Sequence, residues 1–159
     1  MRPGTTILVP LDFSKASHSA LRYACQLADR LRASLHVLHV VQPPAMPTGY
    51  VEAYVATPDV LERFEAEGHQ LLNEALTPEE QARYHAALIQ RTGDPASEIL
   101  RYVTAHGNID LIVIATHGRG GVARLMMGSV ADRLVRAAPC PVLTLRDPVE
   151  HARPAAPAA

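Results

Sequence analysis

The chain has 159 residues, of which 48% are apolar and 19% charged, and its formal net charge is −1. This composition is typical of one soluble globular domain with its own core. The small net charge gives no reason to expect nucleic acid or an anionic membrane as a partner. No apolar run approaches the roughly 20 residues of a membrane span, and residues 1–6 do not resemble a signal peptide. We therefore expect a cytoplasmic protein.

Cysteine and lysine are both scarce, which excludes two kinds of site. Cys25 and Cys140 are too few for a disulfide framework and have no metal-binding or redox spacing. Lys15 is the only lysine. A P-loop needs a lysine beside its Ser or Thr, because the ammonium group contacts the phosphates. Nucleotide binding through a P-loop is therefore excluded.

The first half of the chain alternates apolar runs with helical patterns. Residues 6–10 form a short apolar run that proline ends, and they predict a strand. Ser14 is placed to cap a helix over residues 15–32, where apolar residues recur at helical spacing. Residues 34–41 alternate apolar and polar positions and predict a second strand. Residues 42–57 carry three prolines and predict a long loop.

An acidic helix and a third strand are predicted next. Residues 58–76 indicate a helix whose carboxylates are more typical of a solvated face than of a metal site. Residues 84–91 fit the third strand. Asp94 is placed as the N-cap of another helix, with Pro95 at its first position, and the run His106-Gly107-Asn108 ends it.

The last part of the chain continues the alternation. Residues 109–115 are almost entirely apolar and predict a strand that is covered on both sides. Residues 128–138 predict a helix, and Val142 to Arg146 a fifth strand. The Pro- and Ala-rich residues 147–159 predict a disordered tail. Residues 1–146 are therefore expected to form one α/β domain with a mostly parallel sheet, in which ligands bind at the carboxyl ends of strands.

A glycine-rich turn follows the fourth predicted strand. Gly118 and Gly128 are separated by nine residues, and Ser129 follows directly. This layout exposes backbone N–H groups twice near one point, once in the turn and once at a helix start. Unpaired amides and the positive end of a helix dipole both favour an anion. The stretch therefore predicts a phosphate-binding site.

From about residue 5 to residue 146 the sequence resembles the universal stress protein family, in particular its UspA-like, ATP-binding members. The resemblance rests on Val-Pro-Leu-Asp-Phe-Ser at 9–14, Thr-Gly-Asp-Pro at 92–95, Thr-His-Gly-Arg at 116–119, Gly-Ser-Val-Ala at 128–131 and Ala-Pro-Cys-Pro-Val at 138–142. We accordingly expect an open, Rossmann-like sheet of five strands in the order 3-2-1-4-5, with helices on both faces.

The ATP-binding members carry Gly, two residues, Gly, nine residues, and Gly with Ser or Thr. Gly118 and Gly128 with Ser129 match this pattern, but Ala115 stands at the first position. A methyl group there lies where the backbone approaches the ribose, and a positive φ becomes costly. Alanine is the smallest replacement for glycine, so we expect the site to be retained.

Carried over by position, the resemblance implies an adenine-nucleotide site. Asp12 would accept hydrogen bonds from the ribose. Val41 would hold the adenine through its backbone, with Pro10 and Leu11 lining the same pocket. The phosphates would be surrounded by Gly118, Arg119, Gly128, Ser129 and Val130. Ala115 would lie beside the ribose, and His117 near the ligand. The ligand would be ATP, ADP or AMP, with any Mg²⁺ or Mn²⁺ held by the phosphates.

The resemblance also implies a homodimer that pairs through the strand Val142 to Arg146, whose edge would otherwise be exposed. We predict a stress-response protein that adenine nucleotide regulates by ordering loops for an unknown protein partner, and not an enzyme. One alternative is a dimeric interaction module that binds no nucleotide. Another is a slow ATPase or a nucleotidyl-transfer enzyme, although no general base is placed by the sequence.

Four candidate residues also have a plain structural interpretation. Asp12 suits a turn before the cap of the first helix, and Ser129 is a good N-cap in its own right. His36 and His39 are three residues apart and so lie on opposite faces of a strand. This spacing favours ordinary strand histidines over a metal-binding pair.

Overall fold

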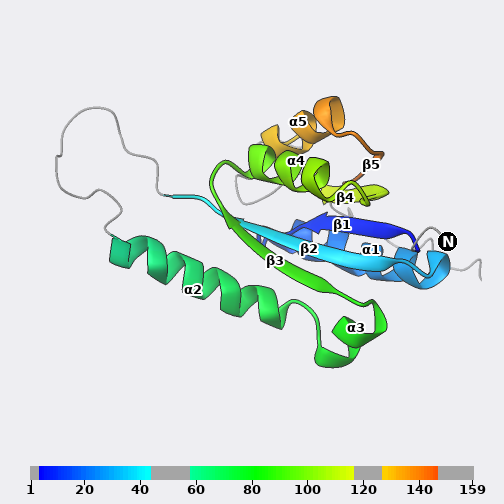
Figure 1. The fold of residues 1–159 in the computed structure, drawn as a ribbon, viewed down its shortest axis with the longest axis horizontal. Coiled ribbons are helices and arrows are strands. Elements are labelled where there is room, and N and C mark those ends of the chain that lie inside the picture. Colours follow the sequence, from blue (N-terminus) through cyan, green and yellow to red (C-terminus); the bar gives the residue numbers. More distant parts are fainter. Residues whose placement is uncertain (1–3, 44–57, 117–126, 147–159) are drawn as a thin grey trace, which may run out of the picture.

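The computed structural model describes residues 4–43, 58–116 and 127–146, and these form an α/β fold (Figure 1). The five described strands pair in parallel in the order β3-β2-β1-β4-β5, which confirms the predicted order. The strands are β1 (Thr6–Pro10), β2 (Ser34–Val41), β3 (Ala87–Thr92), β4 (Leu111–Ala115) and β5 (Val142–Leu145). The helices are α1 (Lys15–Leu31), α2 (Pro58–Glu74), α3 (Pro78–Arg83), α4 (Pro95–His106) and α5 (Ser129–Ala137).

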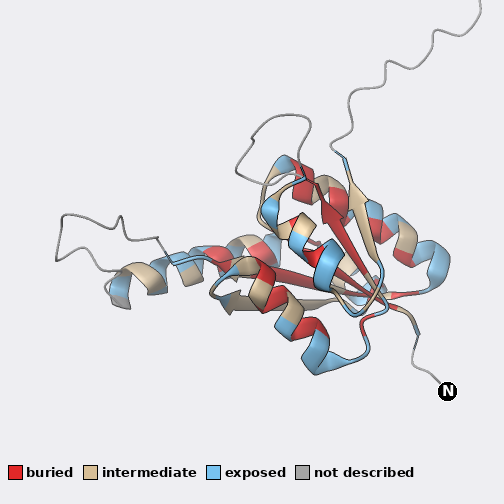
Figure 2. Ribbon diagram, turned by 90° about the horizontal axis from the view of Figure 1, so that it is seen from above, coloured by how far each residue is buried: buried red, intermediate tan, exposed pale blue. Residues whose placement is uncertain are grey.

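Two apolar layers hold the helices against the sheet. The layer against α1 and α2 contains Leu21, Val37 and Leu72, and the opposite layer, against α4 and α5, contains Ile99 and Leu134. Figure 2 shows the buried residues gathered in the strands and on the inner sides of the helices. All five residues of β1 are buried, as expected for a central strand covered on both faces.

The predicted caps of α1 and α4 agree with the structure. The Ser14 hydroxyl accepts the N–H of Ser17 at the start of α1, and the Asp94 carboxylate accepts the N–H of Ser97 at the start of α4. Gly107 ends α4 in the left-handed conformation. These caps satisfy backbone groups that a helix terminus otherwise leaves unpaired.

The prediction of a strand from residue 84 was wrong, because β3 begins only at Ala87 and the short helix α3 precedes it. Thr77 and Glu80 form a capping box at the start of this helix, and His85 has a φ of 44° in the turn behind it. The capping box favours a helix turn over an extended chain. The predicted helix 58–76 likewise ends earlier, at Glu74.

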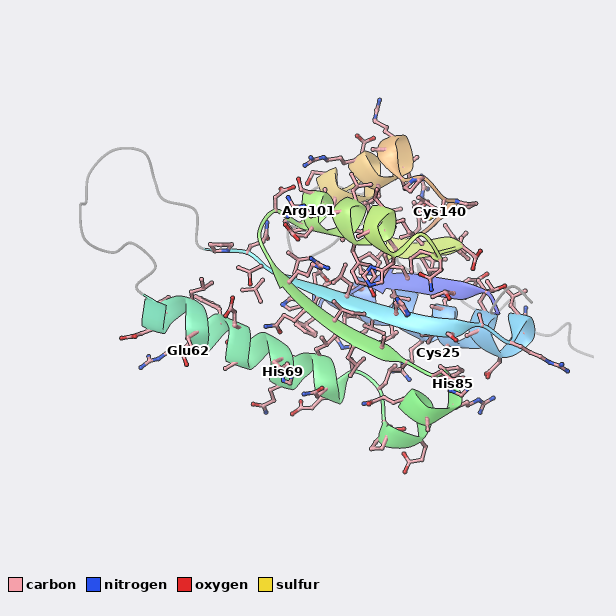
Figure 3. All side chains as sticks on the ribbon, in the orientation of Figure 1. Cys25, Glu62, His69, His85, Arg101 and Cys140 are labelled. Atoms are coloured by element: carbon pink, nitrogen blue, oxygen red, sulfur yellow. The ribbon has the colours of Figure 1, made fainter. Side chains whose placement is uncertain are left out.

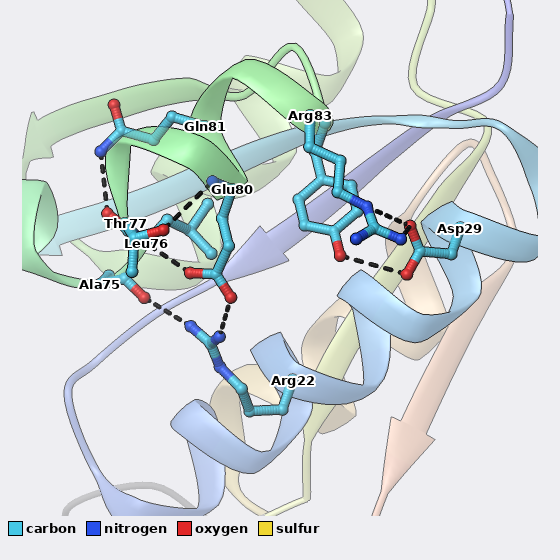
Figure 4. Close-up of polar contacts among 9 residues, drawn as sticks. Arg22, Asp29, Ala75, Leu76, Thr77, Glu80, Gln81 and Arg83 are labelled. Atoms are coloured by element: carbon cyan, nitrogen blue, oxygen red, sulfur yellow. Dashed lines mark hydrogen bonds and ion pairs between the residues drawn. The ribbon is translucent and has the colours of Figure 1, made fainter.

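Helix α3 is fastened to α1 by side chains that are far apart in sequence (Figure 4). Arg22 donates to the Glu80 carboxylate and to the carbonyl oxygen of Ala75. Arg83 donates to Asp29 across 2.8 Å. These partly exposed ion pairs fix the position of α3 more than they add to stability.

The outer side of α2 is solvated, as its acidic sequence predicts. Glu62 and His69 are exposed and project away from the sheet (Figure 3). None of the described helices has the length and apolar character that a bilayer span requires. The predicted tail at 147–159 and most of the predicted loop at 42–57 lie outside the described residues.

Candidate functional site

The carboxyl ends of the three central strands lie at one edge of the sheet, because all of them run in parallel and β1 lies between β2 and β4. This edge carries Pro10 and Leu11 at the end of β1, Val41 at the end of β2, and Ala115 at the end of β4. From β1 the chain first adds β2 and β3 on one side of the sheet and then β4 and β5 on the other. Ligands of open α/β sheets usually bind at the point where the strand order reverses in this way.

The turn from β1 to α1 holds Asp12 in a fixed position. Its Oδ1 atom accepts the backbone N–H of Ser14 across 3.0 Å, so the carboxylate has the turn role that its sequence position suggests. The next residue, Phe13, has a φ of 62°, which is uncommon for a residue with a bulky side chain. A carboxylate accepts hydrogen bonds at both oxygens, so this turn role is compatible with ligand contact.

Val41 is buried at the end of β2, and its carbonyl oxygen accepts the N–H of Gly93 across 2.9 Å. Gly93 has a φ of 146°, and a Cβ atom built there would lie 3.2 Å from Cγ of Glu98. The turn after β3 therefore packs closely beside the end of β2. A carbonyl oxygen has two lone pairs, so the backbone of Val41 retains capacity for a second hydrogen bond.

Ala115 is the last residue of β4 and is buried, with 7% of its surface exposed. Among the described residues, the non-glycine residues with a positive φ are Phe13, Arg32 and His85, so Ala115 is not strained. Alanine in place of glycine at position 115 therefore does not carry the cost of a positive φ.

Helix α5 begins beside the end of β4. Gly128 donates its N–H to the carbonyl oxygen of Thr116 and serves as the N-cap, without a side chain to cap the helix. Ser129 is the first residue of the helix, so its interpretation as the N-cap was wrong. The backbone N–H groups of Ser129, Val130 and Ala131 are the first amides of the helix, where the dipole favours an anion.

Three predicted site residues, His117, Gly118 and Arg119, lie outside the described residues. The structure thus brings together the ends of β1, β2 and β4 with the start of α5, and leaves the glycine-rich turn unassigned. Over the described parts of the chain, no group of three or more His, Cys, Asp or Glu side chains is arranged to hold a metal ion.

An ion pair connects the start of α4 to the middle of α5. Arg133 donates to the Asp94 carboxylate across 2.8 Å and to the Ser97 hydroxyl across 2.9 Å. The bonds from Ser97 and the charge of Arg133 lower the pKa of Asp94 below its usual range. The carboxylate is therefore ionised at neutral pH and holds the turn after β3 against the last helix.

Sequence reasoning treated His39 as an ordinary strand histidine, but its ring contacts the candidate site. Its Nδ1 atom lies 2.8 Å from the carbonyl oxygen of Leu11, and its ring centroid lies 4.3 Å from that of Phe13. A histidine between Val37 and Val41, on the buried face of a strand, is the signal that a polar partner exists, since a buried polar group needs one. The alternating pattern does not identify the partner.

Comparisons with known proteins identify the family. The family described as the universal stress protein family matches residues 4–146. Universal stress protein YxiE of Bacillus subtilis is 31% identical over 145 residues, which are 88% of this chain and 97% of the relative.

Solved structures agree with this assignment. Universal stress protein UspA from Lactobacillus plantarum has a TM-score of 0.73 at 29% identity, over 89% of this chain and 97% of that one. A family protein from Arabidopsis thaliana with AMP bound shares the fold, with a TM-score of 0.59 and 20% identity over 91% of this chain and 93% of that one. The chain belongs to the universal stress protein family.

Proposed function

We propose that this protein binds an adenine nucleotide, ATP, ADP or AMP, at the carboxyl edge of its sheet and uses it as a regulatory ligand. The observation that carries the proposal is the position of α5, whose first amides lie beside the end of β4 with Gly128 as a cap that has no side chain. Such a helix start favours a phosphate group. The AMP bound to the Arabidopsis relative supports an adenine nucleotide on this fold.

The nucleotide extends from the end of β2 to the start of α5. The adenine lies at the backbone of Val41 with Pro10 and Leu11 beside it, and the ribose contacts Asp12. The phosphates are bound at the start of α5 and in the turn before it, by His117, Gly118, Arg119, Gly128, Ser129 and Val130. Ala115, at the end of β4, lies nearby. A divalent cation, Mg²⁺ or Mn²⁺, is held by the phosphates.

The protein acts in the cytoplasm as a homodimer and not as an enzyme. β5 is an edge strand, and all four of its residues are half-buried. Pairing with the same strand of a second copy would cover this edge. Bound nucleotide shifts the population of conformations that a protein partner recognises.

Isothermal titration with ATP, ADP and AMP tests the binding proposal. We expect micromolar affinity for the wild type and a loss of affinity in Asp12→Asn and Ser129→Ala. Asp29→Asn and Ser19→Ala are matched controls on α1, outside the proposed site, and are expected to bind as the wild type does. The absence of both heat and a thermal shift with all three nucleotides would leave a nucleotide-free interaction module as the function.

Two further measurements separate the other parts of the proposal. Light scattering should give twice the chain mass of 17.2 kDa, and a monomer would contradict the homodimer alone. Steady ATP turnover that Ser129→Ala abolishes would show an enzyme in place of a regulator.

A further inference from the structure

The imidazole of His39 connects the middle of the sheet to the turn that carries Asp12. His39 lies on the face of β2 that α1 and α2 cover, and 8% of its surface is exposed. Its Nδ1 atom lies 2.8 Å from the carbonyl oxygen of Leu11. A carbonyl oxygen only accepts hydrogen bonds, so Nδ1 carries the hydrogen and His39 is the donor.

The same ring also contacts the other side of the turn. The centroid of the Phe13 ring lies 4.3 Å from that of His39, with the two planes tilted by 41°. Phe13 has a left-handed backbone, which is unfavourable for a residue with a Cβ atom. The ring contact offsets part of this cost. His39 therefore holds the two residues that flank Asp12, one through its carbonyl oxygen and one through its ring.

Helix α2 covers the far edge of this imidazole at Gly68. A Cβ atom built on Gly68 would lie 3.0 Å from Cδ2 and 3.1 Å from Nε2 of His39. The backbone of α2 is also tied to β3, because Gln90 donates to the carbonyl oxygen of Glu65 across 2.9 Å. The ring is thus enclosed between the sheet, the turn and α2, and has little room to turn away.

We infer that His39 is a positioning residue of the proposed nucleotide site: it holds the β1–α1 turn so that the Asp12 carboxylate faces the ligand. This inference rests on the proposed function. If the donor is removed, the buried carbonyl oxygen of Leu11 loses a hydrogen bond and the turn loses one of its contacts. The effect of His39 on binding is indirect, since the proposed contact with the nucleotide is made by Asp12.

Three substitutions of His39 separate the hydrogen bond from packing. His39→Asn keeps a donor near the Nδ1 position, because both nitrogens are bonded to Cγ. His39→Leu fills similar space without a donor, and His39→Gln places its amide further out, near Nε2. We expect about a tenfold or larger loss of ATP affinity in the Leu and Gln variants and recovery to within about threefold in the Asn variant.

His36→Leu is the matched control, because His36 lies on the opposite face of the same strand and contacts Tyr102 of α4. It is expected to lower stability and to leave ATP affinity unchanged. Equal ATP affinity in wild-type, Leu and Asn forms of residue 39 would overturn the inference. Failure of the Asn variant to restore affinity that the Leu variant has lost would overturn the role of the donor.

Backbone NMR without ligand distinguishes this inference from the proposed function. The amide signals of Asp12, Phe13 and Ser14 should shift in His39→Leu and return toward wild-type values in His39→Asn. Unshifted signals in a folded Leu variant would overturn the positioning role even if the wild type binds ATP. If the wild type binds no adenine nucleotide, the proposed function fails, and these signals alone decide whether His39 holds the turn.

Discussion

The backbone N–H of Gly128 donates to the carbonyl oxygen of Thr116 across 2.6 Å, and this bond places the start of α5 beside the end of β4. Two residues separated by the whole glycine-rich turn are thereby brought into direct contact. The start of the helix therefore lies at the same edge of the sheet as the Asp12 turn, because β4 is the neighbour of β1. The relationship makes the N-cap position the most informative place at which to change the charge of the site.

Gly128→Asp should weaken nucleotide binding without lowering the stability of the protein. Gly128 has a φ of −59°, which any residue adopts, so a carboxylate side chain is able to cap the first amides. We expect unchanged stability, or a gain of about 0.5 kcal/mol, because aspartate is a good N-cap. We also expect at least about a tenfold loss of ATP affinity, since the carboxylate competes with phosphate for the amides and repels it. Urea unfolding and titration calorimetry measure the two effects.

Gly128→Asn is the control, because asparagine caps a helix without a charge. Its loss of ATP affinity should be smaller, and the difference from the Asp variant should decrease as salt screens the charge. An Asp variant that binds ATP like the wild type would contradict the phosphate position.

Gly68→Ala should destabilise the protein, although alanine is the better helix former. Gly68 lies in α2, where alanine usually gains about 1 kcal/mol over glycine. Here the added Cβ would lie 3.0 Å from Oε1 of Gln90 and 3.0 Å from Cδ2 of His39. We expect a net loss of about 1–2 kcal/mol from this overpacking, measured by urea unfolding.

Gly107→Ala provides the matched comparison, because the space around Gly107 is open but its φ is 60°. An alanine there costs about 1 kcal/mol through its backbone alone. Gly107→Asn should recover most of this loss, since asparagine tolerates the left-handed conformation. Gly68→Ser, in contrast, should recover none of the stability that Gly68→Ala loses. Recovery by serine at position 68 would show that α2 does not pack closely on His39.

The stability of the protein should fall as the pH is lowered past neutrality, and His36 should contribute. Nδ1 of His36 lies 2.8 Å from the Tyr102 hydroxyl, and its ring centroid lies 6.3 Å from that of His106. Burial and the neighbouring His106 lower the pKa of His36. As the pH falls, His36 is therefore protonated in the unfolded chain before it is protonated in the folded protein. Its contribution to the free energy of unfolding is complete above the unfolded pKa and is lost as the pH falls through the folded pKa.

Urea unfolding at pH 7.5 and pH 5 checks this prediction. The loss of unfolding free energy between these pH values should be smaller in His36→Asn than in the wild type. Tyr102→Phe removes the hydroxyl partner and should lower stability already at pH 7.5. Equal pH dependence in the wild type and His36→Asn would contradict a contribution from this histidine.

The Cys25 thiol should react slowly in the folded protein. Burial raises the pKa of Cys25 to about 11, and the reactive species is the thiolate. In a Cys140→Ser background, a disulfide reagent at pH 8 should label Cys25 only after urea is added. The pKa of Cys25 is higher in the folded protein than in the unfolded chain. The contribution of this thiol to the free energy of unfolding is therefore present below the unfolded pKa and is lost as the pH rises toward 11. Rapid stoichiometric labelling of the native protein would contradict this.

The caps of α1 and α4 could be predicted because their signals are local, whereas the strand order has no local signal. Ser14, Asp94 and Gly107 each act within one turn of their own position, and resemblance to a family supplied the order of the strands. Helix α3 could not be predicted from periodicity, because its six residues include no buried one. Its place depends on Arg22 and Asp29, which lie more than fifty residues earlier in the chain.

The residues of the candidate site were predictable in part for the same reason. Asp12, Val41 and Ala115 follow from the ends of three predicted strands. His39 does not, because its partner Leu11 lies 28 residues away and belongs to another strand end. The alternative interpretation of Ser129 as the N-cap of α5 was wrong by one residue, because serine is the better capping side chain and only the backbone shows that Gly128 is the cap.

The two apolar layers have a consequence for the newly made chain. The layer against α1 and α2 has its buried residues between Ile7 and Ala115, whereas the opposite layer also needs Ala131 and Leu134 of α5. When synthesis has passed β4 but not reached α5, one side of the sheet has all its helices and the other is still partly bare. Until the last helix emerges, apolar residues such as Ile112 lack part of their cover and offer a surface to chaperones.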